Sequence, residues 1–383
     1  MLDLKNLSNQ FDFKKDAIIT YKREISREMI DYQNALSKIN YADVELNKKL
    51  PKYSGAKLLE EGELIKKFKE NWNSRSEAIE WVDKILSGVN VGGVDGSQIY
   101  PDKNFEIPIA AVQICTVHNK HTIDKNYHIA ISTNIITPDE FEKHQVYAFG
   151  KDLVDARRFA DECNGLIKLM QEHKKIYTLL DGTLVVSHIK AMNQNIKDIY
   201  IKALKKLFRA SYRTRNPIIG YVDTSQSRDL VLMMSFLFNL TKTNKLLDSI
   251  LLEKYLNWGD RTKAFLCDRD DRHGGKTSVL DMYDEFRDGV AFFYIRMSRG
   301  LPNRVEFPRW IVEVGETEKI ANIVRAETIL RGDYPDILLR AHEMVAIKEK
   351  EHNLFFGMLE NFCKIHGIPI KRSAKWFHKG IRL

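Results

Sequence analysis

Hydrophobic positions along the chain first follow a helical spacing and then a strand spacing. Between residues 1 and 88, apolar residues recur every three or four positions among charged ones, which predicts amphipathic helices. Three apolar runs rich in β-branched residues follow closely, at 89–100, 107–117 and 127–136. Three such runs in close succession predict an antiparallel meander.

Helix and strand patterns then alternate. A helical pattern at 139–172 is followed by a strand at 176–184, a basic helix at 189–212, a strand at 218–222 and a helix at 224–240. Such alternation is typical of α/β domains, in which helices pack on the faces of a sheet.

The last third of the chain is less regular. We interpret residues 241–290 as a mostly helical insertion, followed by strands at 291–297 and 305–314 and helices at 316–330 and 336–351. The whole order predicts an α/β fold with a mixed sheet and helices on both faces, and not a pure Rossmann unit.

Composition narrows the class of protein. The chain has 383 residues, of which 44% are hydrophobic and 29% charged, as expected of a globular protein with a substantial core. No apolar run approaches the length of a membrane span, and the N-terminus lacks a signal core, so we expect a cytoplasmic protein without membrane contact. Four widely separated cysteines exclude a disulfide framework and a cysteine-based zinc ribbon; they are Cys115, Cys163, Cys267 and Cys363.

The net charge of +8 is concentrated in two stretches. Residues 189–216 hold eight Lys or Arg and one Asp, whereas residues 364–383 hold six Lys or Arg and no acid. A local surplus of this kind predicts a phosphate-binding surface. A solvated helix face and an exposed tail have the same composition, so charge alone does not decide between these interpretations.

Two aspartates at predicted strand ends are the strongest chemical signal. Asp95 follows an apolar strand between glycines, and Asp181 likewise precedes Gly182 at the end of the strand at 176–184. If the two strands are neighbours, the carboxylates converge and repel each other unless divalent cations lie between them. A plain Asp-Gly β-turn is the alternative at each position.

Two further residues are candidates because of their positions on predicted helices. Glu162 borders the buried stripe of its helix, from where it can point towards Asp181, or pair on the surface with Arg158. His342 lies beside the inner face of the helix that follows Pro335. Such a histidine is either a site residue or a structural one.

Other motifs fail. Residues 270–277 end like a Walker A loop but begin with Asp270 where that motif needs glycine. The chain also lacks a Gly-x-Ser-x-Gly elbow, so neither nucleotide binding nor serine hydrolysis is supported.

Taken together, these pieces resemble the NurA family of nucleases, the partners of HerA-type hexameric DNA translocases. The resemblance covers roughly residues 88–352. It is carried, in this order, by Gly93-Val94-Asp95-Gly96-Ser97, by Arg158 with Glu162, by Leu180-Asp181-Gly182-Thr183-Leu184, and by Tyr334-Pro335 with Ala341-His342. Each motif is short, and their order and spacing give the set its specificity.

The resemblance implies an RNase H-like fold and a divalent-metal nuclease site. Asp95, Asp181 and His342 would bind metal, Glu162 would complete the site, and Tyr334 is an additional candidate. The implied cofactor is Mn²⁺ or Mg²⁺, with two ions. The implied activity is 5′-to-3′ exonuclease and single-strand endonuclease cleavage of DNA during end resection, by a homodimer docked on a HerA-type hexamer.

The resemblance divides the chain into a helical N-terminal extension at 1–87, the nuclease domain at 88–352 with its insertion at about 241–290, and a basic C-terminal segment at 353–383. Asp223 is an additional candidate ligand or a helix N-cap ahead of Thr224. In the C-terminal segment, Trp376 and Phe377 are suited to stacking on bases or to docking on a protein.

Two alternative functions remain open. One is a non-catalytic adaptor that binds DNA or an ATPase ring. The other is an RNase H-like enzyme that acts on RNA or on branched DNA.

Overall fold

The computed structural model describes residues 2–39, 44–122 and 126–371. The chain divides into two compact units. Unit 1 comprises Met1–Glu70, Val222–Ser278 and Ala291–Val305, and unit 2 comprises Asn71–Tyr221, Val279–Val290 and Glu306–Leu383. The boundaries predicted near residues 87 and 352 stay predictions.

Unit 2 is built on five strands that lie in the order β5-β4-β3-β6-β7. The first three in sequence form an antiparallel meander, whereas β6 is parallel to β3 and β7 is parallel to β6. The mixed sheet predicted from the pattern is therefore confirmed. The strands are β3 (Asn90–Ile99), β4 (Ala110–Asn119), β5 (Tyr127–Ile136), β6 (Ile176–Asp181) and β7 (Ile218–Val222).

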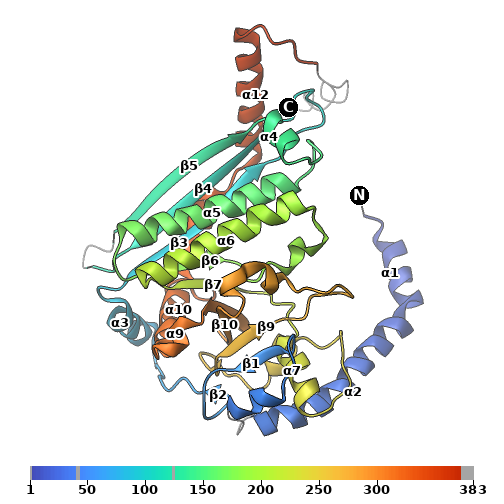
Figure 1. Cartoon of the computed structure of the whole chain (residues 1–383), viewed down its shortest axis with the longest axis vertical. Coiled ribbons are helices and arrows are strands. Elements are labelled where there is room, and N and C mark those ends of the chain that lie inside the picture. The colour runs from blue at the N-terminus through green and yellow to red at the C-terminus, as the bar shows by residue number, and fades with distance from the viewer. Residues whose placement is uncertain (1, 40–43, 123–125, 372–383) are drawn as a thin grey trace. The chain divides into compact units, whose positions relative to one another are not determined.

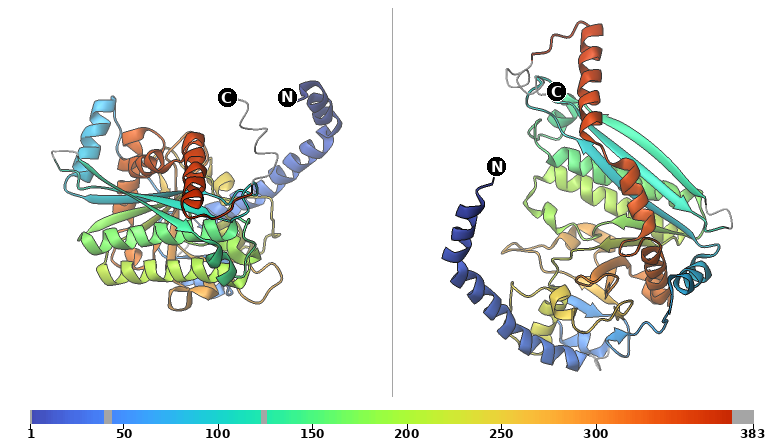
Figure 2. Two further views of the ribbon diagram at one scale, coloured as in Figure 1. Left: turned by 90° about the horizontal axis from the view of Figure 1, so that it is seen from above. Right: turned by 180° about the vertical axis from the view of Figure 1, so that it is seen from behind.

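Helices cover both faces of these strands (Figures 1 and 2). A Cβ on Gly92 would contact Leu169, whereas a Cβ on Gly93 would contact Ile337 from the other side. Successive residues of a strand point to opposite faces, so these two contacts identify the layers. One layer is α5 (Asp152–Glu172) with α6 (Gln194–Thr214), and the other contains α3 (Arg75–Leu86), α10 (Thr317–Arg331) and α11 (Asp336–Val345).

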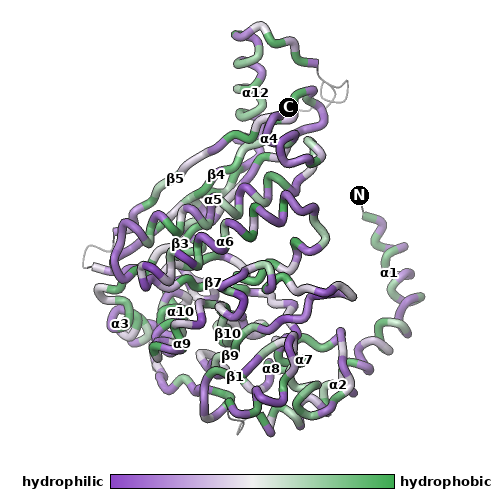
Figure 3. Tube along the Cα trace, viewed as in Figure 1, coloured by the Kyte–Doolittle hydropathy of each residue, from purple (hydrophilic) through white to green (hydrophobic). Residues whose placement is uncertain are grey.

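The helices of the first layer form because their apolar positions recur on one side, as the alternation of colours along them in Figure 3 shows. Asn193 caps α6 by accepting a hydrogen bond of 2.9 Å from the backbone N–H of Ile196. The helix ends where Arg215 takes the left-handed conformation, with φ of 55°.

Three predicted elements of unit 2 are divided or shortened. The helix predicted at 139–172 is interrupted around Gln145, which has a φ of 53°, so that α4 (Pro138–Lys143) precedes α5. The strand predicted at 305–314 ends at Pro308, which has no N–H for a strand ladder. The helix predicted at 336–351 ends at Val345, whose carbonyl oxygen accepts a hydrogen bond from Gln113.

The described part of unit 2 contains four further helical elements. They are η2 (Ser187–Ala191), η3 (Val279–Phe286), α9 (Trp310–Glu313) and α12 (Glu349–Ile365). One side of α12 packs through Phe356 and Leu359 against a cluster that includes Phe105.

Unit 1 begins with the predicted helices, α1 (Leu4–Phe13) and α2 (Lys15–Ile39), followed by η1 (Val44–Lys49). The helical pattern expected after Lys52 is wrong, because β1 (Gly55–Leu58) and β2 (Ile65–Lys66) are strands. Strand β1 pairs with β9, which buries Ala56 and Leu58 completely. This pairing between distant segments overrides the local helical spacing.

The prediction of a mostly helical insertion at 241–290 is wrong, because this segment contains the strands β8 and β9 and only short helices. Strand β9 also pairs with β10, β8 pairs with β10 and β2 pairs with β8. The remaining elements are α7 (Asp229–Leu237), α8 (Asp248–Leu252), β8 (Arg261–Thr262), β9 (Phe265–Asp268), β10 (Val290–Ile295) and β11 (Asn303–Pro308), the last two of which continue into unit 2. Within the part of the chain that the structure describes, no helix has the length and apolarity needed to cross a membrane.

Candidate functional site

Asp95 and Asp181 occupy matching positions on neighbouring parallel strands of unit 2. Val94 of β3 lies opposite Leu180 of β6, and each aspartate is the next residue of its strand. Neighbouring strands are about 4.8 Å apart and matched residues point to the same face, so the two carboxylates share one neighbourhood. The prediction that both aspartates end their strands is wrong for Asp95, because β3 continues to Ile99, whereas Asp181 is the last residue of β6.

His342 reaches the first of these carboxylates from α11. Its Nδ1 lies 2.8 Å from Oδ2 of Asp95, and its side chain is 63% exposed. The Oδ1 atom of Asp95 accepts a hydrogen bond of 2.8 Å from the backbone N–H of Gly96. The imidazole therefore combines an acidic partner with access to solvent, which is unusual for a purely structural histidine.

Glu162 approaches from the other face of the sheet. A Cβ on Gly96 would lie 2.7 Å from Oε1 of Glu162, so the glycine leaves the space that this carboxylate occupies. Arg158, one turn earlier on α5, donates a hydrogen bond of 2.8 Å to the same oxygen. Glu162 is 4% exposed, so its pairing with Arg158 is not the surface contact considered as its alternative role.

The electrostatic setting of Glu162 links it to both aspartates. Burial raises the pKa of Glu162 to about 7, Arg158 opposes this rise, and Asp95 and Asp181 add to it. Arg158 itself has a pKa above its usual range, because attraction to Glu162, Asp155 and Asp95 outweighs its own burial. A buried carboxylate with a raised pKa, close to other acids, is a common feature of functional sites.

Tyr334 contacts the second aspartate. Its hydroxyl donates a hydrogen bond of 2.6 Å to Oδ1 of Asp181, and its ring meets the ring of Tyr221 edge-on at 5.1 Å. The structure thus connects Tyr334 to the site through a specific contact.

The turn that follows Asp181 is held by a buried residue that the sequence did not reveal. Glu306 is fully buried, and its Oε2 accepts hydrogen bonds from the hydroxyl of Thr183 at 2.7 Å and from the N–H of Leu184 at 2.6 Å. Tyr283 donates a hydrogen bond of 2.8 Å to the carbonyl of Leu184. These contacts fix the backbone that carries Asp181, and no local pattern around either residue indicates them.

Asp223 and the two aromatic residues of the C-terminal segment are the remaining candidates. Asp223 belongs to unit 1, where its Oδ1 accepts a hydrogen bond of 2.6 Å from Asn303. The prediction that Asp223 caps a helix starting at Thr224 is wrong, because α7 begins at Asp229. Trp376 and Phe377 lie outside the described residues.

The basic stretch at 189–216 forms most of α6, and part of its charge is neutralised. Lys205 pairs with Asp284, and Arg209 pairs with Glu285. Lys206 and Arg213 line a hollow between α5 and α6, together with Asn164, Ile167, Gln171, Arg209, Ala210 and Thr214.

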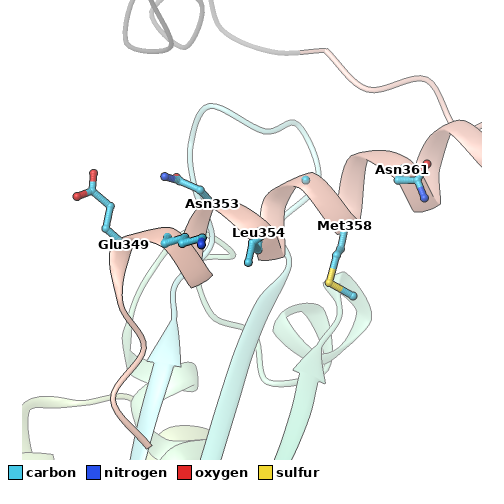
Figure 4. Close-up of a pocket in the computed structure, with 7 residues that line it drawn as sticks. Glu349, Asn353, Leu354, Met358 and Asn361 are labelled. Carbon is cyan, nitrogen blue, oxygen red and sulfur yellow. The ribbon is translucent and has the colours of Figure 1, made fainter. Parts of the chain in front are cut away.

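A larger hollow lies along α12 (Figure 4). It has a volume of about 720 Å³ and includes none of the predicted site residues. Its lining consists of Glu349, Lys350, Asn353, Leu354, Gly357, Met358 and Asn361. The lining contains one acid, one base, two amides and apolar side chains, and these do not form a catalytic site.

A family model matches most of the chain. The sequence model of the NurA domain matches residues 89–347, a range that contains all five site residues of unit 2. This range closely follows the 88–352 expected from the motifs, so the predicted resemblance is confirmed. None of the curated protein sequences matches the chain.

Two solved structures are similar to this chain. Endonuclease V from Bacillus subtilis is 13% identical, with 77% of this chain and 97% of that chain covered and a TM-score of 0.33. The catalytic domain of human endonuclease V is 12% identical, with 92% of this chain and 99% of that chain covered and a TM-score of 0.30. The strand order of unit 2, and not these low scores, carries the assignment of an RNase H-like mixed sheet flanked by helices.

Proposed function

Because the chain belongs to the NurA domain family, whose members are nucleases, we propose that it is a divalent-metal-dependent DNA nuclease. The observation that carries this proposal is the in-register pair Asp95 and Asp181, with His342 hydrogen-bonded to Asp95 from α11. Glu162 lies beside Gly96 on the other face of the sheet, where the charges of both aspartates add to the rise in its pKa.

The chemistry of these side chains fits divalent cations. Carboxylate oxygens are the ligands that Mg²⁺ and Mn²⁺ prefer, and an imidazole is compatible with Mn²⁺. Among the described residues, no three acidic, histidine or cysteine side chains are already arranged around a single ion position. Asp181 and His342 are both exposed, so solvent and ions can reach their side chains.

In this proposal Asp95, Asp181 and His342 hold the ions, and Glu162 completes the site. When bound, divalent ions would supply an activated water and would stabilise the leaving oxygen in phosphodiester hydrolysis. Tyr334 orients Asp181 through its hydroxyl, and Arg158 keeps the Glu162 carboxylate beside Gly96. The Nδ1 of His342 lies 2.8 Å from Asp95 Oδ2, where the imidazole can share a proton with that carboxylate.

The proposed activity, oligomeric state and partner follow from the resemblance to the NurA family. We propose 5′-to-3′ exonuclease and single-strand endonuclease activity in DNA end processing, by a homodimer that acts with a HerA-type hexameric translocase. Lys206 and Arg213 of α6, which form no ion pair with another described residue, support binding to a phosphate backbone that does not depend on base sequence. The chain shows no convincing ATP-binding motif, so translocation along DNA would come from the partner.

Purified protein incubated with Mn²⁺ and with matched oligonucleotides tests this function. The substrates are single-stranded DNA, duplex DNA, RNA and a DNA junction of related sequence, each labelled at the 5′ or the 3′ end. The proposal predicts DNA cleavage that EDTA abolishes, with 5′-labelled duplex losing its label first. Exclusive cleavage of RNA or junctions would contradict it, and absence of any cleavage would favour a non-catalytic adaptor.

A further inference from the structure

A group of aromatic and basic side chains lies on unit 2 close to the start of α5. The connection from α4 to α5, at 143–151, reads Lys-His-Gln-Val-Tyr-Ala-Phe-Gly-Lys and contains no acid. Tyr147 is 67% exposed, and its ring lies 6.1 Å from that of Phe149. This connection leads from α4 into α5 (Figure 1).

Lysines accompany these rings. Lys103 Nζ lies 5.9 Å from the centroid of the Tyr147 ring, and Lys151 Nζ lies 4.9 Å from the centroid of Tyr100. Both lysines are exposed, and neither forms an ion pair with another of the described residues. Their charges therefore remain available to an anionic ligand.

The backbone of the connection is held in place. The N–H of Gly150 donates a hydrogen bond of 2.8 Å to the carbonyl of Tyr147, and Asn195 of α6 donates one of 2.9 Å to the carbonyl of His144. A side chain that is exposed on a fixed backbone loses less conformational entropy when a ligand orders it. The exposed ring of Tyr147 is thus presented in a defined position.

The group is connected to the acidic site by α5. The hydroxyl of Tyr100 donates a hydrogen bond of 2.6 Å to Asp155, which lies three residues before Arg158 on the same side of that helix. Tyr100 also lies four residues beyond Gly96, which corresponds to about 13 Å along a strand. A stacked nucleic-acid strand spans this distance with about four nucleotides, at about 3.4 Å each.

We propose that Tyr147 and Phe149, with Lys103 and Lys151, form a stacking platform that binds single-stranded nucleic acid next to the acidic site. Aromatic rings stack on bases of any sequence, and the lysines hold the adjacent phosphates. The role of the platform depends on the proposed nuclease function, because the platform would position a strand for cleavage at Asp95 and Asp181. Its binding is measurable without cleavage.

Fluorescence anisotropy with a labelled oligo-dT in EDTA tests the platform separately from the activity. Tyr147→Ala and Phe149→Ala are each expected to weaken binding about tenfold, the effect of losing one base–aromatic stack. Tyr147→Phe retains the ring and is expected to bind within about twofold of the wild type. Phe362→Ala, at an aromatic residue on α12 that is 53% exposed, is the matched control and should have no effect.

The contribution of the two lysines is measured separately, from the salt dependence of the affinity. Lys103→Ala with Lys151→Ala is expected to flatten the dependence of log affinity on log salt by about 1.4, which corresponds to two phosphate contacts on a single strand. Wild-type affinity in Tyr147→Ala and Phe149→Ala, or an equal loss in Phe362→Ala, would overturn the platform. Ring-dependent binding in a protein that cleaves nothing would support the platform and refute the nuclease function.

Discussion

His342 and Asp95 are separated by 247 positions in the chain, yet the Nδ1 of the imidazole lies 2.8 Å from Oδ2 of the carboxylate. Helix α11 brings the histidine to the face of β3 on which Asp95 points, because Gly93, two residues earlier on that face, lies against Ile337. This contact connects the last motif of the family to the first one.

The first prediction concerns this contact. His342→Ala should lower the rate of Mn²⁺-dependent DNA cleavage by about 10²-fold or more, because it removes a ligand or proton acceptor. Its free energy of unfolding should change by no more than about 0.5 kcal/mol, because the side chain is mostly exposed. The cleavage rate and urea unfolding of His342→Ala are compared with those of Met344→Ala, at an exposed position of the same helix. An equal loss of activity in both variants would argue against a specific role for the imidazole.

The second prediction concerns the space beside Gly96. A methyl group there would lie 2.7 Å from both Arg158 Cγ and Glu162 Oε1 and 2.9 Å from Ile114 Cδ1. Gly96→Ala should therefore displace the Glu162 carboxylate, destabilise the protein by about 1–3 kcal/mol and lower the cleavage rate. Gly357→Ala on α12 is the control, because nothing lies within 4 Å of the added methyl group. The control should stabilise the protein by up to about 1 kcal/mol.

The third prediction concerns the pH dependence of stability in metal-free protein. Burial raises the pKa of Glu162 from 4.5 to about 7 in the folded state. The folded state then binds the proton more tightly than the unfolded state, so this group favours folding at low pH and loses that contribution as the pH rises through 7. Relative to Glu162→Gln, the wild type should lose about 1–3 kcal/mol between about pH 5 and about pH 8. If the free energies of unfolding of the wild type and of Glu162→Gln in EDTA change in parallel with pH, the raised pKa of Glu162 is contradicted.

The fourth prediction concerns a stack of histidines away from the site. The ring of His118 lies 4.7 Å from that of His128 and 4.2 Å from that of His173. Burial, reinforced by these neighbours and Lys120, lowers the pKa of His118 from 6.5 to about 4. Its contribution to stability is complete above the unfolded-state value near 6.5 and is lost as the pH falls towards 4. Acid unfolding of His118→Phe should therefore occur at a lower pH than that of the wild type, and His366→Phe should leave the midpoint unchanged.

The sequence was informative where local pattern and topology agree. The prediction that both aspartates end their strands holds for Asp181 and is wrong for Asp95, because β3 continues to Ile99. The two aspartates are nevertheless close, because β3 and β6 are parallel neighbours in matching register. Glu162 borders the buried stripe of α5, and the sequence left open whether it points inwards or pairs with Arg158 on the surface; in the structure it is buried and pairs with Arg158.

Other features depend on contacts between distant segments. Glu306 binds the turn after Asp181 from more than a hundred positions away, and neither segment has a pattern that indicates the other. In unit 1, β1 pairs with β9, so that Gly55 lies opposite Asp268, 213 positions later, against the helical spacing of the residues of β1. The hydrophobic pattern predicts one continuous helix at 139–172, which includes Tyr147. The break at Gln145 is not predicted, because its positive φ has no signature in that pattern.

The central claim is that Asp95 and Asp181 act together to bind the metal ions that cleave DNA. The most direct test is the rate of cleavage of a labelled DNA oligonucleotide as a function of Mn²⁺ concentration, for the wild type, Asp95→Ala and Asp181→Ala. We predict saturable Mn²⁺-dependent cleavage by the wild type and no detectable cleavage by either variant, with circular dichroism spectra that match the wild type. Full activity in either folded variant would contradict the claim.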